Sequence, residues 1–153
     1  MKIKQKIHLK KEFFKTDSLL KQLSLSTVCS EALCPNRHEC FSKKVATFLA
    51  LGNVCTRHCS FCNIGSHKKK LLPPDPEEIN KIVQTAKILN LSHIVITMVC
   101  RDDLKDGGAH HLASILHTIK RELPKTTSEI LTGDFEGKIE NLQVVLNWEP
   151  YYL

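Results

Sequence analysis

Apolar and polar positions along the chain predict three consecutive pairs of a strand and a helix. Short, partly β-branched apolar runs are typical of buried strands, and they lie at residues 45–51, 93–99 and 128–131. Apolar side chains recur at helical spacing in the segments at residues 79–89, 112–119 and 139–146. Because strands that alternate with helices usually pair in parallel through right-handed crossovers, this order predicts an α/β fold, with a functional site at the carboxyl ends of the strands.

Residues at the helix ends support these boundaries. Asp75 and Pro76, followed by two acidic residues, are typical of a helix start, and Asn90 is typical of the end of the same helix. Asp106 precedes the second helix and is its expected N-cap.

The part of the chain before the first strand has a different pattern. The first 28 residues are rich in lysine and have only a short helical repeat, so we expect a loosely attached arm. Residues 29–44 hold three cysteines and Pro35, and we expect a loop that something other than a hydrophobic core holds in place. The chain therefore divides into an N-terminal extension, residues 1–44, and an α/β part, residues 45–153.

Composition and charge exclude several classes of protein. Hydrophobic residues make up 42% and charged residues 25% of the chain, as in globular proteins and unlike disordered or collagen-like ones. No run reaches the roughly 18 apolar residues of a membrane span, and the basic N-terminus is not followed by the apolar segment of a secretory signal. We therefore expect a cytoplasmic protein that is not inserted into a membrane. The net charge of +6 is uneven, because residues 1–70 hold 14 basic and only 4 acidic residues. This basic half of the chain would attract an acidic partner.

Six of the seven cysteines form two closely spaced sets. The upstream triad consists of Cys29, Cys34 and Cys40, and the loop triad consists of Cys55, Cys59 and Cys62. An odd number of cysteines in a cytoplasmic chain favours metal or redox chemistry over disulfides. Three thiolates can each bind one corner of a four-iron cluster, which leaves the fourth iron open for a substrate or cofactor.

The spacing also leaves a zinc site open as an alternative. His58 or His67 could complete a four-ligand zinc site with the loop triad, and a basic zinc module could bind nucleic acid. Against nucleic-acid binding, only 6% of the residues are aromatic and they do not alternate with basic residues. Cys100, alone after the second strand, is expected to be a small packed residue, and His110 and His111 are expected at the surface.

The strings around the cysteines resemble a known family. The string Cys55-Thr56-Arg57-His58-Cys59-Ser60-Phe61-Cys62 has the CxxxCxxC spacing of the radical S-adenosylmethionine (SAM) superfamily. Further matching strings are Thr27-Val28-Cys29, Cys34-Pro35-Asn36, Ala46-Thr47-Phe48, Arg101-Asp102-Asp103-Leu104, Asp106-Gly107-Gly108-Ala109 and Asp134-Phe135. With the upstream triad directly before the loop triad, the chain resembles lipoyl synthases from about residue 13 to residue 147.

The resemblance implies an enzyme that inserts sulfur. The loop triad would hold a [4Fe-4S] cluster that binds SAM at its open iron and cleaves it reductively, and the upstream triad would hold an auxiliary [4Fe-4S] cluster that donates sulfur. The product would be a lipoyl group, with sulfur at C6 and C8 of an octanoyl chain on a lipoyl carrier domain or a glycine-cleavage H-type protein. The electron donor would be a flavodoxin or ferredoxin, and nucleic acid would not be a partner.

The loop after the second strand is where the resemblance places SAM. The expected contacts are Arg101, Asp102, Asp103, Gly107 and Gly108. The acids could bind an ammonium group or ribose hydroxyls, and a glycine pair allows a ligand to approach the backbone closely. A polar loop with a helix cap would have the same residues, and the sequence supports both interpretations equally.

The implied fold is a partial (β/α) barrel of the radical SAM type, with about three of six βα units present, preceded by a Cys-rich N-terminal extension. The match ends at Asn147, before the serine-rich motif that supplies the family's fourth auxiliary ligand. We therefore expect a truncated copy that does not turn over by itself.

Overall fold

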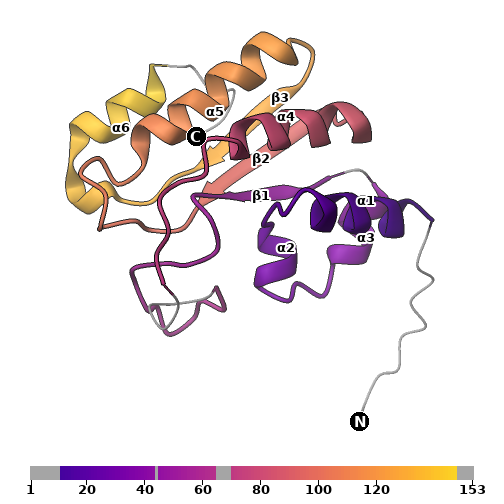
Figure 1. Ribbon diagram of the computed structural model, residues 1–153, viewed down its shortest axis with the longest axis horizontal. Coiled ribbons are helices and arrows are strands. Elements are labelled where there is room, and N and C mark those ends of the chain that lie inside the picture. Colours follow the sequence, from indigo (N-terminus) through magenta and orange to yellow (C-terminus); the bar gives the residue numbers. More distant parts are fainter. Residues whose placement is uncertain (1–10, 44, 65–69, 148–153) are drawn as a thin grey trace.

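A computed structural model describes residues 11–43, 45–64 and 70–147 of the chain (Figure 1). His67 and the first ten residues of the expected arm lie outside these ranges. The elements are α1 (Lys11–Gln22), α2 (Val28–Glu31), α3 (Arg37–Ser42), β1 (Thr47–Ala50), α4 (Glu78–Leu89), β2 (His93–Met98), α5 (Ala109–Glu122), β3 (Thr127–Leu131), the 3-10 helix η1 (Phe135–Gly137) and α6 (Ile139–Leu146).

The three strands form one parallel sheet in the order β1-β2-β3. Phe48 pairs with Ile96, and Ile96 pairs with Ile130, so that one fully buried side chain from each strand lies in the same row. This register is the one expected when each strand buries its apolar positions on a common face. The predicted α/β architecture with parallel strands is confirmed.

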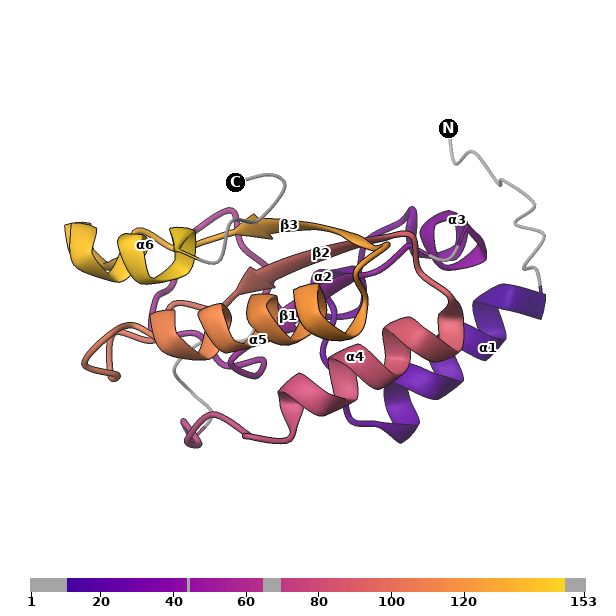
Figure 2. The ribbon, with the colours of Figure 1, turned by 90° about the horizontal axis from the view of Figure 1, so that it is seen from above.

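Helices α4, α5 and α6 follow one another along the same side of the sheet (Figures 1 and 2). The end of α4 lies where the sequence signal places it, whereas the expected start at Asp75 and Pro76 lies just before the helix, whose N-cap is Glu77. Asn90 ends α4 in the left-handed conformation, and the Asp75 carboxylate accepts a hydrogen bond from the Glu77 N–H at 2.9 Å, just before α4 begins. The N-cap of α5 is Gly108 and not the predicted Asp106, although the Asp106 carboxylate accepts from the N–H groups of Gly108 and His110, both at 3.0 Å.

The prediction of a loose arm is wrong for residues 11–28. Phe13 and Leu20 of α1 are buried in the same hydrophobic core as the sheet, and α1 packs against α3 and α4. The lysines of this segment suggested an exposed arm, but Phe13 and Leu20 lie on one helix face, and burying them outweighs the charge of the other face.

The prediction of a loop at residues 29–44 is also wrong, because α2 and α3 lie there. Phe41 of α3 is completely buried, and its ring stacks on that of Phe13 with 5.9 Å between the ring centroids. The segment before α2 reaches the sheet itself: Thr27 bridges Phe48 of β1, and the Leu49 N–H donates to the Ser26 carbonyl at 2.9 Å. The hydrophobic core is therefore continuous across the predicted boundary at residue 44.

No helix within the described ranges is long and apolar enough to cross a membrane.

Candidate metal centre at the strand ends

The upstream triad is built into the short helices α2 and α3. Cys29 lies on α2, Cys34 on the connection between the helices and Cys40 on α3. The Thr27 side chain caps α2 by accepting from the Ser30 N–H at 3.2 Å, and the Cys34 N–H donates to the Cys29 carbonyl at 3.1 Å. Two tight turns therefore bring the three cysteines into one part of the molecule.

Cys29 is the buried member of this triad, and Cys34 and Cys40 are half-buried. Burial raises the pKa of Cys29, and the neighbouring thiols of Cys40 and Cys34 add to this, although the Thr47 backbone N–H acts in the opposite direction. The thiols of Cys34 and Cys40 are thus close enough to Cys29 to act on its pKa. A cluster bound here would have to displace the Cys29 proton.

The loop triad lies in a more open environment. Residues 51–64 form neither helix nor strand, and they leave β1 at the end of the sheet where the loops after β2 and β3 also begin (Figure 1). Cys59 and Cys62 are exposed and Cys55 is half-buried. Local contacts are few: the Cys62 N–H donates to the Cys59 carbonyl at 3.0 Å, and the Arg57 N–H to the Cys55 sulfur at 3.4 Å.

Long-range polar contacts hold this loop against the ends of the other strands. The Arg57 guanidinium donates to both oxygens of Asp102, at 3.0 and 2.8 Å, and to Asp134 at 2.8 Å. The Thr56 N–H donates to the Cys100 carbonyl at 3.0 Å, and the Thr56 hydroxyl lies 2.7 Å from Asp102. One arginine from the loop after β1 therefore binds residues that follow β2 and β3.

This ion pairing changes the protonation of the two acids. The hydrogen bond from Arg57 lowers the pKa of Asp134 to about 2, and it also lowers the pKa of Asp102. Both carboxylates are thus ionised at neutral pH and face the guanidinium. Burial raises the pKa of the nearby Cys100 to about 11, in agreement with the packed role expected for it.

The residues expected to contact SAM lie at the same end of the sheet. Most of them contact other residues of this protein. Arg101 is buried and pairs with Asp103 at 2.7 and 2.8 Å. A Cβ on Gly107 would lie 3.0 Å from the Phe135 ring, and one on Gly108 would overlap the side chain of Leu51. The two glycines therefore make room for two side chains of this protein.

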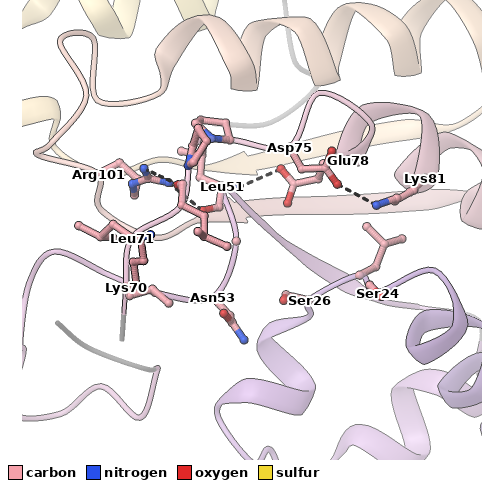
Figure 3. A pocket seen from close by; sticks show the side chains of 16 residues that line it. Ser24, Ser26, Leu51, Asn53, Lys70, Leu71, Asp75, Glu78, Lys81 and Arg101 are labelled. Atoms are coloured by element: carbon pink, nitrogen blue, oxygen red, sulfur yellow. Dashed lines mark hydrogen bonds and ion pairs between the residues drawn. The ribbon is translucent and has the colours of Figure 1, made fainter. Parts of the chain in front are cut away.

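Two cavities lie near these residues. One of about 10 Å³ is lined by Arg57, Cys100, Asp102, Asp134 and others, and is no larger than a single water molecule needs. The other, of about 180 Å³, lies between the segment before α2, the loop after β1 and the start of α4 (Figure 3). Its lining includes Arg101 but none of the cysteines. The SAM contacts remain a prediction.

The donor set fits iron–sulfur clusters. All seven cysteines are free thiols, and thiolates are the usual ligands of such clusters. Within the described part of the chain, no three His, Cys, Asp or Glu side chains are gathered as ligands of a single ion. The upstream sulfurs nevertheless influence one another, and two thiols of the loop triad are exposed on a segment with little structure of its own.

Sequence reasoning assigned no role to several residues that matter here. Arg57 and Asp134 could have been found from the sequence, because they follow β1 and β3 and so place opposite charges at the carboxyl ends of parallel strands. The expectation for His111 was wrong: it lies mostly buried, with its Nε2 2.7 Å from the Glu78 carboxylate. The sequence alone does not distinguish a buried acid at a helix start, such as Glu78, from an exposed acid that caps the helix.

Several known proteins that are similar to this chain in sequence share one name. The chain is 57% identical to the lipoyl synthase of Chlamydia felis over 135 residues, which are 88% of this chain and 43% of the relative. It is 55% identical to that of Chlamydia caviae over 135 residues, and 54% identical to that of Chlamydia muridarum over 145 residues, which are 95% of this chain and 47% of the relative. The chain thus spans about half the length of the curated relatives it matches. No family model matches it.

Proposed function

We propose, from the homology of this chain to lipoyl synthases along 88–95% of its length, that it serves in the reaction of that family. The reaction is the insertion of two sulfur atoms into a protein-bound octanoyl group, and the enzyme class is the radical SAM sulfurtransferases. The observation that carries the proposal is the identity of more than half the residues over a stretch that includes both cysteine triads.

The cofactors proposed are two [4Fe-4S] clusters and SAM. The upstream triad would hold the auxiliary cluster, and the loop triad would hold the cluster at which SAM binds. When bound, these groups supply one-electron cleavage of SAM and a source of sulfur. The chain itself contributes the thiolates and holds them in place.

The remaining parts of the proposal concern fold and partners. The sheet would be part of a radical SAM barrel, with residues 1–44 as its Cys-rich extension. An octanoylated lipoyl carrier domain or a glycine-cleavage H-type protein would be the substrate, a flavodoxin or ferredoxin the electron donor, and the cytoplasm the location. The alternative of a zinc module for nucleic acid gains no support from the relatives, which are named as lipoyl synthases.

The polypeptide of residues 1–153 is expected to form little lipoyl product when tested alone. Among the described strands none pairs with the free edge of β3, and Leu131 at the end of that strand is exposed. An unpaired edge with apolar side chains is a site at which further chain normally packs. The part of the reaction that depends on the loop triad alone is the cleavage of SAM.

The test is anaerobic reconstitution of residues 1–153 with iron and sulfide. We expect bound iron and acid-labile sulfide in equal amounts, little zinc, and formation of 5′-deoxyadenosine when SAM and a reductant are added. Zinc in place of iron, with no 5′-deoxyadenosine, would contradict the proposal.

A further inference from the structure

Leu51 is the residue at which the chain leaves β1, and its backbone is left-handed. Its φ is +68°, and Gly52 follows with a φ of +86°. Glycine takes this conformation freely, but a leucine rarely does because its Cβ crowds the adjacent carbonyl oxygen. A left-handed leucine therefore persists only where the surrounding structure holds it.

Glu78 holds the backbone N–H of Leu51 from one side (Figure 3). Its Oε2 accepts that hydrogen bond at 3.0 Å and lies 2.7 Å from the Nε2 of His111 on α5. Glu78 is only 8% exposed and lies in the first turn of α4, where the helix dipole favours a carboxylate. Two donors and a helix start therefore stabilise a buried acid whose oxygen is directed at the backbone of Leu51.

Arg101 holds the carbonyl of Leu51 from the opposite side (Figure 3). Its Nη1 donates to the Leu51 oxygen at 3.3 Å and its Nη2 to the Leu72 oxygen at 2.9 Å, while Nε and Nη2 pair with Asp103. The residue is 3% exposed. Each nitrogen of this guanidinium is thus bound to the chain itself, so the guanidinium can position the backbone at Leu51 and Leu72.

Gly108 completes the arrangement by accepting the side chain of Leu51. A Cβ at Gly108 would overlap the Leu51 methyl groups, and Gly108 has a φ of +91°. Leu51 therefore packs directly on the backbone at the start of α5, and it is 3% exposed.

We propose that Glu78, Arg101 and Gly108 form a clamp on Leu51 whose role is to position the loop triad. This inference rests on the proposed function, because the loop triad is taken as the cluster site. Glu78 and Arg101 fix both polar groups of one peptide residue, Gly108 fixes its side chain, and the left-handed turn that results sets the direction in which the chain runs toward Cys55.

The clamp acts together with the anchor at Thr56. The Thr56 N–H donates to the Cys100 carbonyl at 3.0 Å, so the short stretch from Leu51 to Thr56 is held at both ends. If Leu51 relaxed to an ordinary extended conformation, Gly52 and Asn53 would leave β1 in another direction, and the bond at Thr56 could not form in the same place. The position of Cys55 would then be lost with it.

The first experiment uses the protein without metal and measures hydrogen exchange of individual backbone amides. The test variant is Glu78→Ala, which removes the acceptor of the Leu51 N–H. The matched control is Glu77→Ala, because Glu77 is an exposed acid at the start of the same helix whose side chain accepts a hydrogen bond from the Asn80 amide at 3.2 Å. Glu78→Gln keeps an oxygen acceptor and should retain wild-type exchange.

We expect the Thr56 amide, as well as that of Leu51, to exchange at least tenfold faster in Glu78→Ala and to be unchanged in Glu77→Ala. Exchange that increases at Leu51 alone would overturn the proposal, because it would show only the loss of one hydrogen bond. If Glu78→Ala does not fold, Arg101→Lys tests the other side of the clamp: increased exchange at Thr56 supports the proposal, and unchanged exchange there overturns it.

The second experiment measures iron after reconstitution and uses the upstream triad as an internal control. In Glu78→Ala we expect the cluster that changes its EPR spectrum on adding SAM to fall to a small fraction of its wild-type amount. If Arg101→Lys replaces that variant, the total bound iron is measured without SAM, because Arg101 is itself an expected SAM contact, and it should fall by about half. The other cluster should be retained. Equal loss of both clusters, or loss of neither, would overturn the positioning role. A wild-type chain that binds no iron would instead contradict the proposed function, and the amide exchange would then decide on the clamp by itself.

Discussion

The two cysteine triads have the same number of thiols but are held by different forces. Cys29 and Cys40 lie on short helices and Cys34 on the connection between them, and the apolar side chains of this segment belong to the main hydrophobic core. Cys55, Cys59 and Cys62 lie on a loop without regular structure that is fixed by contacts of Thr56 and Arg57 with residues far along the chain. Hydrophobic burial therefore holds the first triad, whereas the second is held by directed polar contacts together with the packing of Cys55 and Ile64 on a small hydrophobic cluster.

The difference has a physical consequence for how each site can fail. Hydrophobic burial is not directional, so a site held by it is lost mainly when the core unfolds. Hydrogen bonds and ion pairs depend on geometry, so a site held by them can be displaced while the fold remains intact. The second arrangement suits a site that a ligand must enter, because its thiols can stay exposed to solvent while the fold remains intact.

The largest effect is expected for a change in the core beneath the upstream triad. Phe41→Ala removes a completely buried ring that stacks on Phe13. Such a substitution destabilises a protein by about 3–5 kcal/mol. Because the core is continuous across the sheet, urea unfolding followed by circular dichroism should show the whole chain losing stability. Unfolding of α1–α3 alone, with the sheet unaffected, would instead show that the two regions are independent.

A smaller effect is expected at the clamp beneath the loop triad. Gly108→Ala forces a Cβ against Leu51 and a non-glycine residue into a φ of +91°, which together should destabilise the chain by about 2–4 kcal/mol.

The matched control for this prediction is Gly52→Ala. Gly52 has a similar φ of +86°, but a Cβ there would meet nothing within 4 Å, so the loss should be only about 1 kcal/mol. Thermal unfolding of both variants measures the difference. Equal losses would mean that the contact between Leu51 and Gly108 contributes nothing.

The smallest effect is expected for the ion pair that joins the loop triad to the end of β3. Arg57 holds the pKa of Asp134 at about 2, below the roughly 3.9 of a free aspartate, so the pair stabilises the fold above about pH 4 and is lost as the pH falls through 2. In Arg57→Gln, carboxyl NMR should show the pKa of Asp134 returning toward 3.9. An unchanged low value would indicate that the Glu136 backbone N–H, 3.1 Å away, and not Arg57, is the cause.

The regular part of the fold was predictable because its signals are local and periodic. The helix over Ile139–Leu146 and the left-handed Asn90 at the end of α4 are found where the sequence places them. The packing of α1 was missed because lysines dominate its composition, although Phe13 and Leu20 have the spacing of a buried helix face, and α2 and α3 were missed because they are too short to show a periodic pattern.

The site was predictable in its chemistry and less so in its contacts. The cysteine spacing and the opposite charges after parallel strands can be read from the sequence. The role of Arg101 cannot, because it depends on the carbonyls of Leu51 and Leu72, which only the folded chain brings to the guanidinium. The left-handed conformation of Leu51 could not be predicted either, because leucine rarely adopts it.

The division of labour between the two triads is tested most directly by iron content and SAM cleavage in two triple variants. Replacing Cys55, Cys59 and Cys62 with alanine should remove about half of the bound iron and all formation of 5′-deoxyadenosine, because three thiolates hold each cluster. Replacing Cys29, Cys34 and Cys40 should remove the other half and leave 5′-deoxyadenosine formation intact. Unchanged SAM cleavage in the first variant, or its equal loss in both with the fold preserved, would contradict the assignment of one cluster to each triad.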